Sequence, residues 1–477
     1  MKKRIFYIIT IFLSILLRFQ GLFHDLWLDE IVAFRLISKL NSPVQIFTRL
    51  FHDGNHHLIS LYIYLMGTDI PCVWIKYRFL SFVLGIGTVM LSILLLKKIF
   101  SNIVPRVIAI MLIATSFPLV VYSSEVRGYS PAIFFAISSL YLLIEYCEKK
   151  KPWASILFKI SFVLGFLFQA TFIYISLGLF MLYLHHLNKK SIRGKQMFYE
   201  IFNLFFLPVA IVLTVYIPFI THLEIGGWPR NSISDVITRF SSFICGNPGY
   251  SPFAYILAIL LIFTLINEIR FLLKKNLDLG VFVLGISILP IVVLVLRLSQ
   301  IYFILSRYFV ILVPFYIMLI SHALYRLWDK GGWRKIFSCI IIMLILSGNV
   351  KRDIDFLIAG RGQYLKALSY IYRTTNSSEI TISSDHDFRN STILKFYYAF
   401  IPKDKKVSYI SSAGALDREM EWYITHSFER RPQIPLSLSF NNTSYILKKS
   451  YLFNGDISGC HWYIYRRKQA KDNLIPL

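Results

Sequence analysis

Negative charge is scarce in this 477-residue chain: Asp and Glu together number 26 against 51 Lys and Arg, and charged residues make up only 16% of the sequence. Apolar residues, by contrast, make up 56%. An ordinary water-soluble protein is therefore excluded, because apolar runs of this extent exceed what a surface in water could hide. Their unbroken apolarity indicates membrane-spanning helices rather than a β-barrel.

Paired cysteines and nucleic-acid signals are also missing. The five cysteines are scattered and show no CxxC spacing, so they support neither a disulfide framework nor a zinc site. The net charge of +25 falls largely in short basic blocks between apolar runs. Such blocks mark the cytoplasmic loops of membrane proteins, and we therefore expect no nucleic-acid partner.

The basic blocks set the predicted topology. If all of them are cytoplasmic, eleven spans satisfy the sequence, and MKKR opens a retained first span because no small-x-small cleavage site follows it. The odd count predicts an N-terminus inside and a C-terminus outside a cell inner or plasma membrane. The predicted spans cover about 4–22, 78–96, 104–122, 129–146, 153–168, 170–187, 199–220, 253–273, 279–297, 302–327 and 334–349.

One apolar segment, HLISLYIYLMG at 57–67, is left out of this count. Its 11 residues would rise only about 17 Å as a helix, which is too short to cross the hydrocarbon core. We expect a helix lying in the outer interface.

Two domains are predicted. Residues 1–349 form a transmembrane domain, with interfacial helices in the outer loop 23–77. Residues 350–477 contain Ser/Asn turn clusters between short β-rich runs, and GCHWYIYRR is typical of a late strand. The fold class is thus a polytopic α-helical membrane protein with a C-terminal extracytoplasmic α/β domain.

Carboxylates and imidazoles gather in the predicted outer loops. Asp29 and Glu30 stand two and three residues after Trp27, His56 and His57 come later in the same loop, and SSEVRGY adds Glu125. Such groups are costly to dehydrate at a membrane surface, so their convergence suggests a polar site. They could ligate a divalent metal (Asp29, Glu125 and His56), act as a general base, or both, although a solvated loop side chain explains each one taken singly.

Several motifs together resemble a known group. They are LWLDE, GNHHLISLYIYLMG, KYRFLSFVLG, YSSEVRGYS and SRYFVILVPFYIML. In this combination the chain resembles bacterial relatives of protein O-mannosyltransferases and lipid A aminoarabinose transferases. These are GT-C membrane glycosyltransferases (glycosyltransferase family 39-like) that take a sugar from a polyprenyl-phosphate carrier. The resemblance spans residues 1 to about 350.

The resemblance implies roles for particular residues. Asp29 stands at the position of the family's catalytic first-loop Asp, and Glu30 is its neighbouring acid. Glu125 and Arg127 match the acid and the base of the later outer turn. At His56 the relatives often carry a polar residue followed by Pro-Pro-Leu or His-Pro-Leu, whereas this chain has HHL.

The chemistry of such a transfer suggests further binding residues. A departing polyprenyl phosphate needs cations to hold its charge, and Arg78, Arg127 and Arg307 fall on the predicted outer side. Snorkelling to lipid head groups is the alternative for each arginine. Trp228, in the Gly/Pro-rich loop 221–252, could stack on a sugar ring, although a purely structural loop explains it equally well.

The predicted activity is transfer of a hexosyl or pentosyl group from a polyprenyl-phosphate donor to a lipid A, glycan or protein acceptor outside the cytoplasm. Inversion is expected, with Asp29 as base and a divalent Mg, Mn or Zn ion left open as cofactor. A transporter or flippase of a lipid-linked sugar is one alternative, but the acids lie at one face and no internal repeat is visible. A polymerase or ligase of surface polysaccharide is the other.

Overall fold

The computed structural model describes residues 2–68, 73–224, 232–247, 252–296, 304–414, 420–429, 432–453 and 457–468. The chain divides into two compact units. The first unit comprises Met1–Leu22 and Leu36–Asp353, and the second comprises Phe23–Arg35 and Ile354–Leu477. Each unit is described by itself below.

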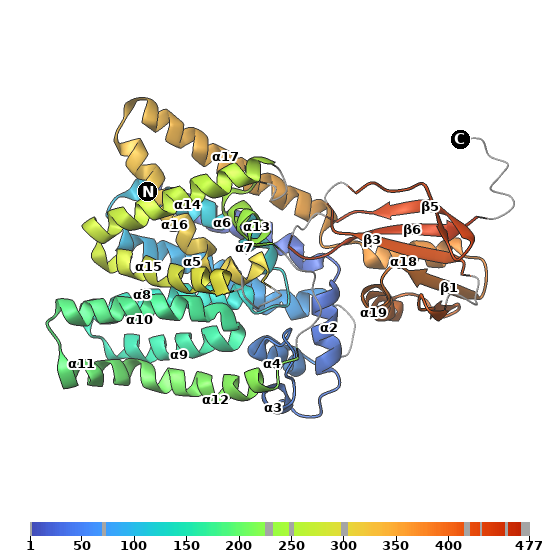
Figure 1. Ribbon diagram of the computed structural model, residues 1–477, viewed down its shortest axis with the longest axis horizontal. Coiled ribbons are helices and arrows are strands. Elements are labelled where there is room, and N and C mark those ends of the chain that lie inside the picture. Colours follow the sequence, from blue (N-terminus) through green and yellow to red (C-terminus); the bar gives the residue numbers. More distant parts are fainter. Residues whose placement is uncertain are drawn as a thin grey trace. The chain divides into compact units, whose positions relative to one another are not determined.

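Long helices dominate the first unit (Figure 1). Within the described residues, nine helices of the chain are long and apolar enough to cross a membrane, which makes it a multi-pass membrane protein. The α-helices of the first unit are α1 (Lys2–Phe19), α3 (Gln45–Thr48), α4 (His57–Met66), α5 (Val73–Ile99), α6 (Ile103–Ala114), α7 (Phe117–Tyr122), α8 (Tyr129–Lys149), α9 (Pro152–Phe168), α10 (Ile173–Lys189), α11 (Gly194–Ile201), α12 (Leu207–Thr221), α13 (Ile233–Cys245), α14 (Pro252–Lys275), α15 (Leu277–Leu296) and α16 (Val313–Asp329).

Irregular helical turns complete this unit, and two helices cross its boundary. Helix α2 (Leu28–Ile37) and helix α17 (Gly332–Ala359) each contribute residues to both units. The turns are η1 (Gln20–Phe23), η2 (Ala170–Phe172), the π-helical η3 (Phe202–Phe206) and η4 (Ser306–Leu312).

One predicted span is divided into two shorter helices. The span predicted at 104–122 is divided into α6 and α7, because Thr115 ends α6 and Ser116 precedes the first turn of α7, which contains Pro118. The backbone N–H of Phe117 then donates to Oδ1 of Asn349 in α17 at 2.9 Å. Helix α9, with 17 residues, covers the span predicted at 153–168. The 10-residue α4 confirms the expected short helix, while its interfacial position stays a prediction.

Close helix contacts rely on glycine. Helices α10 and α15 pack together, and a Cβ placed on Gly285 would lie 2.6 Å from the Cα of Gly178. A Cβ on Gly178 would in turn lie 2.8 Å from the carbonyl oxygen of Phe282. Small residues let two helix backbones approach in this way, which is how helices associate where no water drives them together.

The second unit is an α/β domain built on a six-stranded mixed sheet (Figure 1). The strand order is β2-β1-β3-β6-β5-β4, with β1 parallel to both β2 and β3 and the remaining pairs antiparallel. The strands are β1 (Glu379–Ser384), β2 (Lys406–Tyr409), β3 (Trp422–Ser427), β4 (Ser437–Phe440), β5 (Thr443–Tyr451) and β6 (His461–Arg467), and the helical elements are α18 (Tyr364–Thr374), α19 (Asp387–Tyr397) and η5 (Tyr398–Phe400).

Aromatic residues fill both faces of this sheet. On one face, Trp462 of β6 contacts Tyr364 of α18 with ring centroids 4.9 Å apart, and its indole N–H donates to Asn390 of α19 at 3.0 Å. On the opposite face, Tyr423, Tyr445, Tyr463 and Tyr465 form one buried cluster. This alternation follows the two-residue period of a strand, so the late strand predicted in GCHWYIYRR is confirmed.

The predicted boundary at 349/350 falls inside the continuous helix α17, and the larger segment of the second unit begins at Ile354. The segment Phe23–Arg35, which the sequence places in the first outer loop, joins the second unit. It is held there by hydrogen bonds from the Leu365 N–H to Asp25 Oδ2 at 2.9 Å and from the Tyr397 hydroxyl to the Leu26 carbonyl at 2.8 Å.

Candidate functional site

The turn between α7 and α8 forms the centre of a polar cluster in the first unit. Its Glu125 and Arg127 side chains are buried, with exposed fractions of 1% and 5%. The turn closes locally because the Arg127 N–H donates to the Glu125 carbonyl at 2.8 Å. Buried charges of this kind are costly in a largely apolar helix bundle, which points to a function for this turn.

Three neighbouring segments hold Arg127 and its turn. The Arg127 guanidinium donates to the carbonyl of Gly54 at 3.2 Å, and the Arg127 carbonyl accepts from the Ser81 hydroxyl of α5 at 3.4 Å. Next along the chain, a Cβ on Gly128 would lie 1.7 Å from the carbonyl oxygen of Phe168. Only glycine therefore fits where α8 begins.

His56 lies beside this turn as a neutral imidazole. Its Nδ1 is 3.2 Å from the Phe168 carbonyl oxygen, and its ring lies 5.6 Å from that of Tyr129. Burial, and secondarily the positive charge of Arg127, holds the pKa of His56 well below its usual value. Since a carbonyl only accepts, Nδ1 carries the proton, and Nε2 is a buried acceptor with no hydrogen-bond partner among the described residues.

Arg307 comes to the same cluster from a distant part of the chain. It lies in the 3₁₀ turn η4, is 8% exposed, and interacts electrostatically with His56, Tyr122 and Tyr129. The rings of Tyr122 and Tyr129 are 4.5 Å apart. The structure thus brings together His56, Glu125, Arg127 and Arg307, all four of which the sequence singled out.

The two tyrosines and one further arginine were missed by sequence reasoning. Tyr122 and Tyr129 flank the SSEVRG turn, so the motif itself carried the signal. Arg18, fully buried in α1, donates to the Ala114 carbonyl at 2.9 Å and to the Ser123 hydroxyl at 3.2 Å. It therefore fixes the chain on both sides of α7, and a single charge near the end of an apolar run gives little warning of this role.

Two other predicted binding residues make structural contacts. Arg78 of α5 is fully buried and donates to the carbonyls of Gly21 and Leu22 at 3.2 and 3.4 Å, at the end of α1. The His57 ring stacks on Phe47 and meets Tyr216 and Phe219 edge-on, at centroid distances of 5.1 to 5.5 Å. Both ring nitrogens of His57 lack a hydrogen-bond partner among the described residues. Substrate binding by either residue stays a prediction.

Asp29 and Glu30 open α2 and belong to the second unit. Glu30 is buried, and its Oε2 accepts from the backbone N–H of Trp27, the residue before the helix, at 3.2 Å. This is half of a capping box, in which an acid in the first turn satisfies a backbone donor left without a helical partner. Asp29 is half-buried in the same turn, where a carboxylate also interacts favourably with the helix dipole.

The remaining predicted residues give less information. Trp228 lies outside the described residues.

In the part of the chain that the structure describes, no three His, Cys, Asp or Glu side chains gather closely enough to hold a metal ion. A metal held by Asp29, Glu125 and His56 stays a prediction.

Comparison with known proteins gives structural matches alone. No family model matches the chain, and no curated protein matches it. One similar solved structure is an oligosaccharyltransferase from Archaeoglobus fulgidus in complex with zinc and sulfate, with a TM-score of 0.47, 12% identity, and coverage of 88% of this chain and 67% of that one. Another is ArnT from Cupriavidus metallidurans bound to undecaprenyl phosphate, with a TM-score of 0.49, 10% identity, and coverage of 88% and 92%.

Proposed function

We propose that this chain is a membrane glycosyltransferase. It moves a sugar from a polyprenyl-phosphate carrier to a lipid, glycan or protein acceptor on the extracytoplasmic face of a cell inner or plasma membrane. In this orientation the N-terminus is cytoplasmic and the C-terminal domain is extracytoplasmic, as the basic blocks predict.

The clustering of Arg127 and Arg307 around His56 and the tyrosine pair is the observation that supports this proposal most. Both guanidinium groups are nearly buried, so their charge is weakly screened and attracts a phosphate strongly. The planar guanidinium also matches two phosphate oxygens at once. A phosphate that departs from a sugar gains negative charge, and cations fixed in advance stabilise that change as it happens.

The proposed reaction is a single displacement. The Asp29 carboxylate takes the proton of the acceptor hydroxyl while that oxygen forms its bond to the anomeric carbon. The bond from the anomeric carbon to the phosphate oxygen breaks, and the polyprenyl phosphate leaves with the bonding electron pair, held by Arg127 and Arg307. Attack from the side opposite the leaving group inverts the anomeric carbon.

Replacing the proposed base tests the chemistry. We expect Asp29→Asn to lower kcat by about 100- to 10,000-fold, which is the usual contribution of a general base, while the KM for the carrier stays nearly unchanged. The assay follows a radiolabelled sugar from its polyprenyl phosphate to the acceptor in purified full-length protein.

Asp53→Asn is the matched control for this test. Asp53 lies in the same predicted outer loop, where its carboxylate is 3.1 Å from Nδ1 of His52, and its amide variant should retain transfer. Full activity in a folded Asp29→Asn protein would remove Asp29 as the base. Translocation of the carrier without formation of a new glycosidic bond would favour the transporter.

Arg307→Gln tests carrier binding separately from proton transfer. Loss of one charge-assisted contact to phosphate costs about 1.5–3 kcal/mol, so we expect the carrier to bind roughly 10- to 100-fold more weakly. The exposed Arg193→Gln serves as the control. Equal carrier affinity in the Arg307 variant and its parent would contradict the phosphate role.

A further inference from the structure

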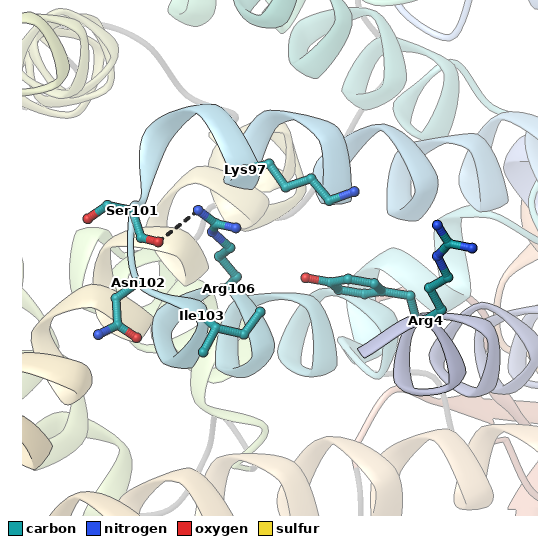
Figure 2. A pocket seen from close by; sticks show the side chains of 7 residues that line it. Arg4, Lys97, Ser101, Asn102, Ile103 and Arg106 are labelled. Atoms are coloured by element: carbon teal, nitrogen blue, oxygen red, sulfur yellow. Dashed lines mark hydrogen bonds between the residues drawn. The ribbon is translucent and has the colours of Figure 1, made fainter. Parts of the chain in front are cut away.

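A basic cavity of about 520 Å³ lies at the start of α1, beside the connection between α5 and α6 (Figure 2). It is lined by Arg4, Tyr7, Lys97, Ser101, Asn102, Ile103 and Arg106. These described lining residues include three cations, Arg4, Lys97 and Arg106, and no carboxylate (Figure 2). The cavity is made entirely of first-unit residues and contains no residue of the His56 and Arg127 cluster.

Two of the three cations, Arg106 and Lys97, are held in place by contacts within the protein. Arg106 donates from Nε to the Phe100 carbonyl at 2.7 Å and from Nη2 to the Ser101 carbonyl at 2.9 Å. The Lys97 ammonium lies over the ring of Tyr7, 5.6 Å from its centroid. Groups that are already ordered lose less conformational entropy when an anion binds.

Polar groups complete the lining. Asn102 accepts from the Val104 N–H at 2.9 Å at the start of α6 and donates to the Tyr325 hydroxyl at 2.8 Å. The positive end of the α6 helix dipole adds to the attraction for an anion that the three cations already create. The lining chemistry therefore suits a phosphate group.

Rows of exposed apolar side chains lie next to Arg4 on α1 and next to Lys97 on α5. On α1, Ile8 and Phe12 follow Arg4 at four-residue spacing and are 65% and 59% exposed. On α5, Met90 and Leu94 precede Lys97 on the same helix face and are 51% and 46% exposed. Helices α1 and α5 pack against each other, so the two rows start from the same cavity. On each of the two helices, a cation thus lies at the end of a row of exposed apolar side chains. This arrangement matches a molecule with an anionic head group and hydrocarbon chains.

We propose that this cavity binds the phosphate head group of an anionic phospholipid, with acyl chains lying along the α1 and α5 rows. The basic ends of these helices place it in the cytoplasmic leaflet under the orientation proposed above. The bound lipid would tie α1 to the connection between α5 and α6. This inference does not depend on the proposed sugar transfer.

Short-chain lipid binding to the purified full-length chain provides the test. Dioctanoyl phosphatidic acid is the probe, with dioctanoyl phosphatidylcholine and inorganic phosphate as comparison ligands, and native mass spectrometry counts the bound molecules. We expect one tightly bound phosphatidic acid in the parent protein. In Arg4→Gln/Lys97→Gln its dissociation constant should rise at least about tenfold, because charge-assisted contacts to the phosphate are lost.

Arg334→Gln/Lys335→Gln is the matched control. These two cations are also exposed and also lie near aromatic rings, at 5.8 Å from Trp333 and 4.9 Å from Trp328, but they do not line the cavity. The control should bind phosphatidic acid as the parent does, and the thermal unfolding midpoints of both variants should match the parent.

Three results would overturn the proposal. Unchanged affinity in Arg4→Gln/Lys97→Gln would place the lipid elsewhere, and an equal loss in the control would indicate unspecific surface attraction. Inorganic phosphate that binds as tightly as phosphatidic acid would show a site for a free anion, because the acyl chains would then contribute nothing. Arg4→Gln and Lys97→Gln tested singly should each give an intermediate affinity.

Discussion

At the scale of single residues, the neutral His56 best shows how burial decides chemical state. The sequence identified a histidine at the edge of an outer loop, where either protonation state was open. In the structure the ring donates to the Phe168 carbonyl through Nδ1 and faces the positive Arg127, and both burial and that charge disfavour the imidazolium. What remains is an acceptor nitrogen beside a proposed phosphate site.

This state predicts acid sensitivity. The unfolded chain takes up a proton on His56 near pH 6.5, whereas the folded protein takes it up only at lower pH, so acid favours unfolding. Below about pH 6.5, this residue should reduce the free energy of unfolding by roughly 1.4 kcal/mol per pH unit. Thermal unfolding midpoints of the full chain at pH 7.5 and 5.5 measure the effect.

The His56→Asn variant should show a smaller loss of stability over this interval, while the exposed His222→Gln should behave as the parent. A parent and a His56→Asn protein that lose stability equally in acid would contradict the neutral imidazole.

Glu30 provides a second prediction at this scale. Because its carboxylate accepts from the Trp27 N–H, Glu30→Ala should cost about 1 kcal/mol of stability, whereas Glu30→Gln keeps an acceptor and should cost little. Unfolding midpoints and sugar transfer are measured on both variants. A stable Glu30→Gln protein that loses transfer would instead give Glu30 the acidic role that the resemblance implies.

At the scale of elements, the position of the Glu125 turn depends on a break between two helices and on hydrogen bonds to distant residues. The hydropathy of the sequence shows neither. The break between α6 and α7 sets where the chain enters the Glu125 turn, and Asn349 and Arg18 fix α7 on either side. Asn349 and Arg18 each form hydrogen bonds with partners more than 90 residues away in the sequence. Sequence periodicity over neighbouring residues carries no information on such contacts.

The glycine contact between α10 and α15 predicts a large effect of side-chain size. Gly178→Leu would place a side chain where Ile286 and the Phe282 carbonyl already lie within 2.8 Å of a Cβ, so the helices must separate. We expect a loss of at least about 1–3 kcal/mol, as for other overpacked contacts. Gly414→Ala, where a Cβ would meet only ordinary contacts from 3.4 Å, should leave the unfolding midpoint unchanged. A Gly178→Leu protein as stable as its parent would refute the close packing.

At the scale of the whole molecule, the chain builds its second unit from segments far apart in the sequence. Phe23–Arg35 and Ile354–Leu477 share a core, in which Phe34 meets Phe396 at 5.8 Å and His24 meets Phe356 at 4.9 Å. The proposed base Asp29 is therefore held by the fold of the α/β domain. Variants that destabilise this domain should lower transfer even when they lie far from Asp29 in the sequence.

The proposed orientation makes a prediction for the intact cell membrane. A cysteine introduced at Asn441, in the exposed turn between β4 and β5, should react with a membrane-impermeant maleimide from the extracytoplasmic side, and one at the exposed Lys190 should not. The natural cysteines are replaced beforehand. Labelling at Lys190 without labelling at Asn441 would reverse the topology and remove the proposed extracytoplasmic reaction.

The sequence by itself determined the membrane class, most of the spans, the short α4 and the α/β nature of the tail, and it singled out His56, Glu125, Arg127 and Arg307 one by one. These follow from hydropathy, from two- and 3.6-residue periods and from local motifs. The tertiary structure decided which backbone groups the buried Arg78 and Glu30 side chains contact, and that Phe23–Arg35 joins the α/β domain. It also created the basic cavity at Arg4, Lys97 and Arg106, because long-range contacts depend on how whole helices pack and not on the order of neighbouring residues.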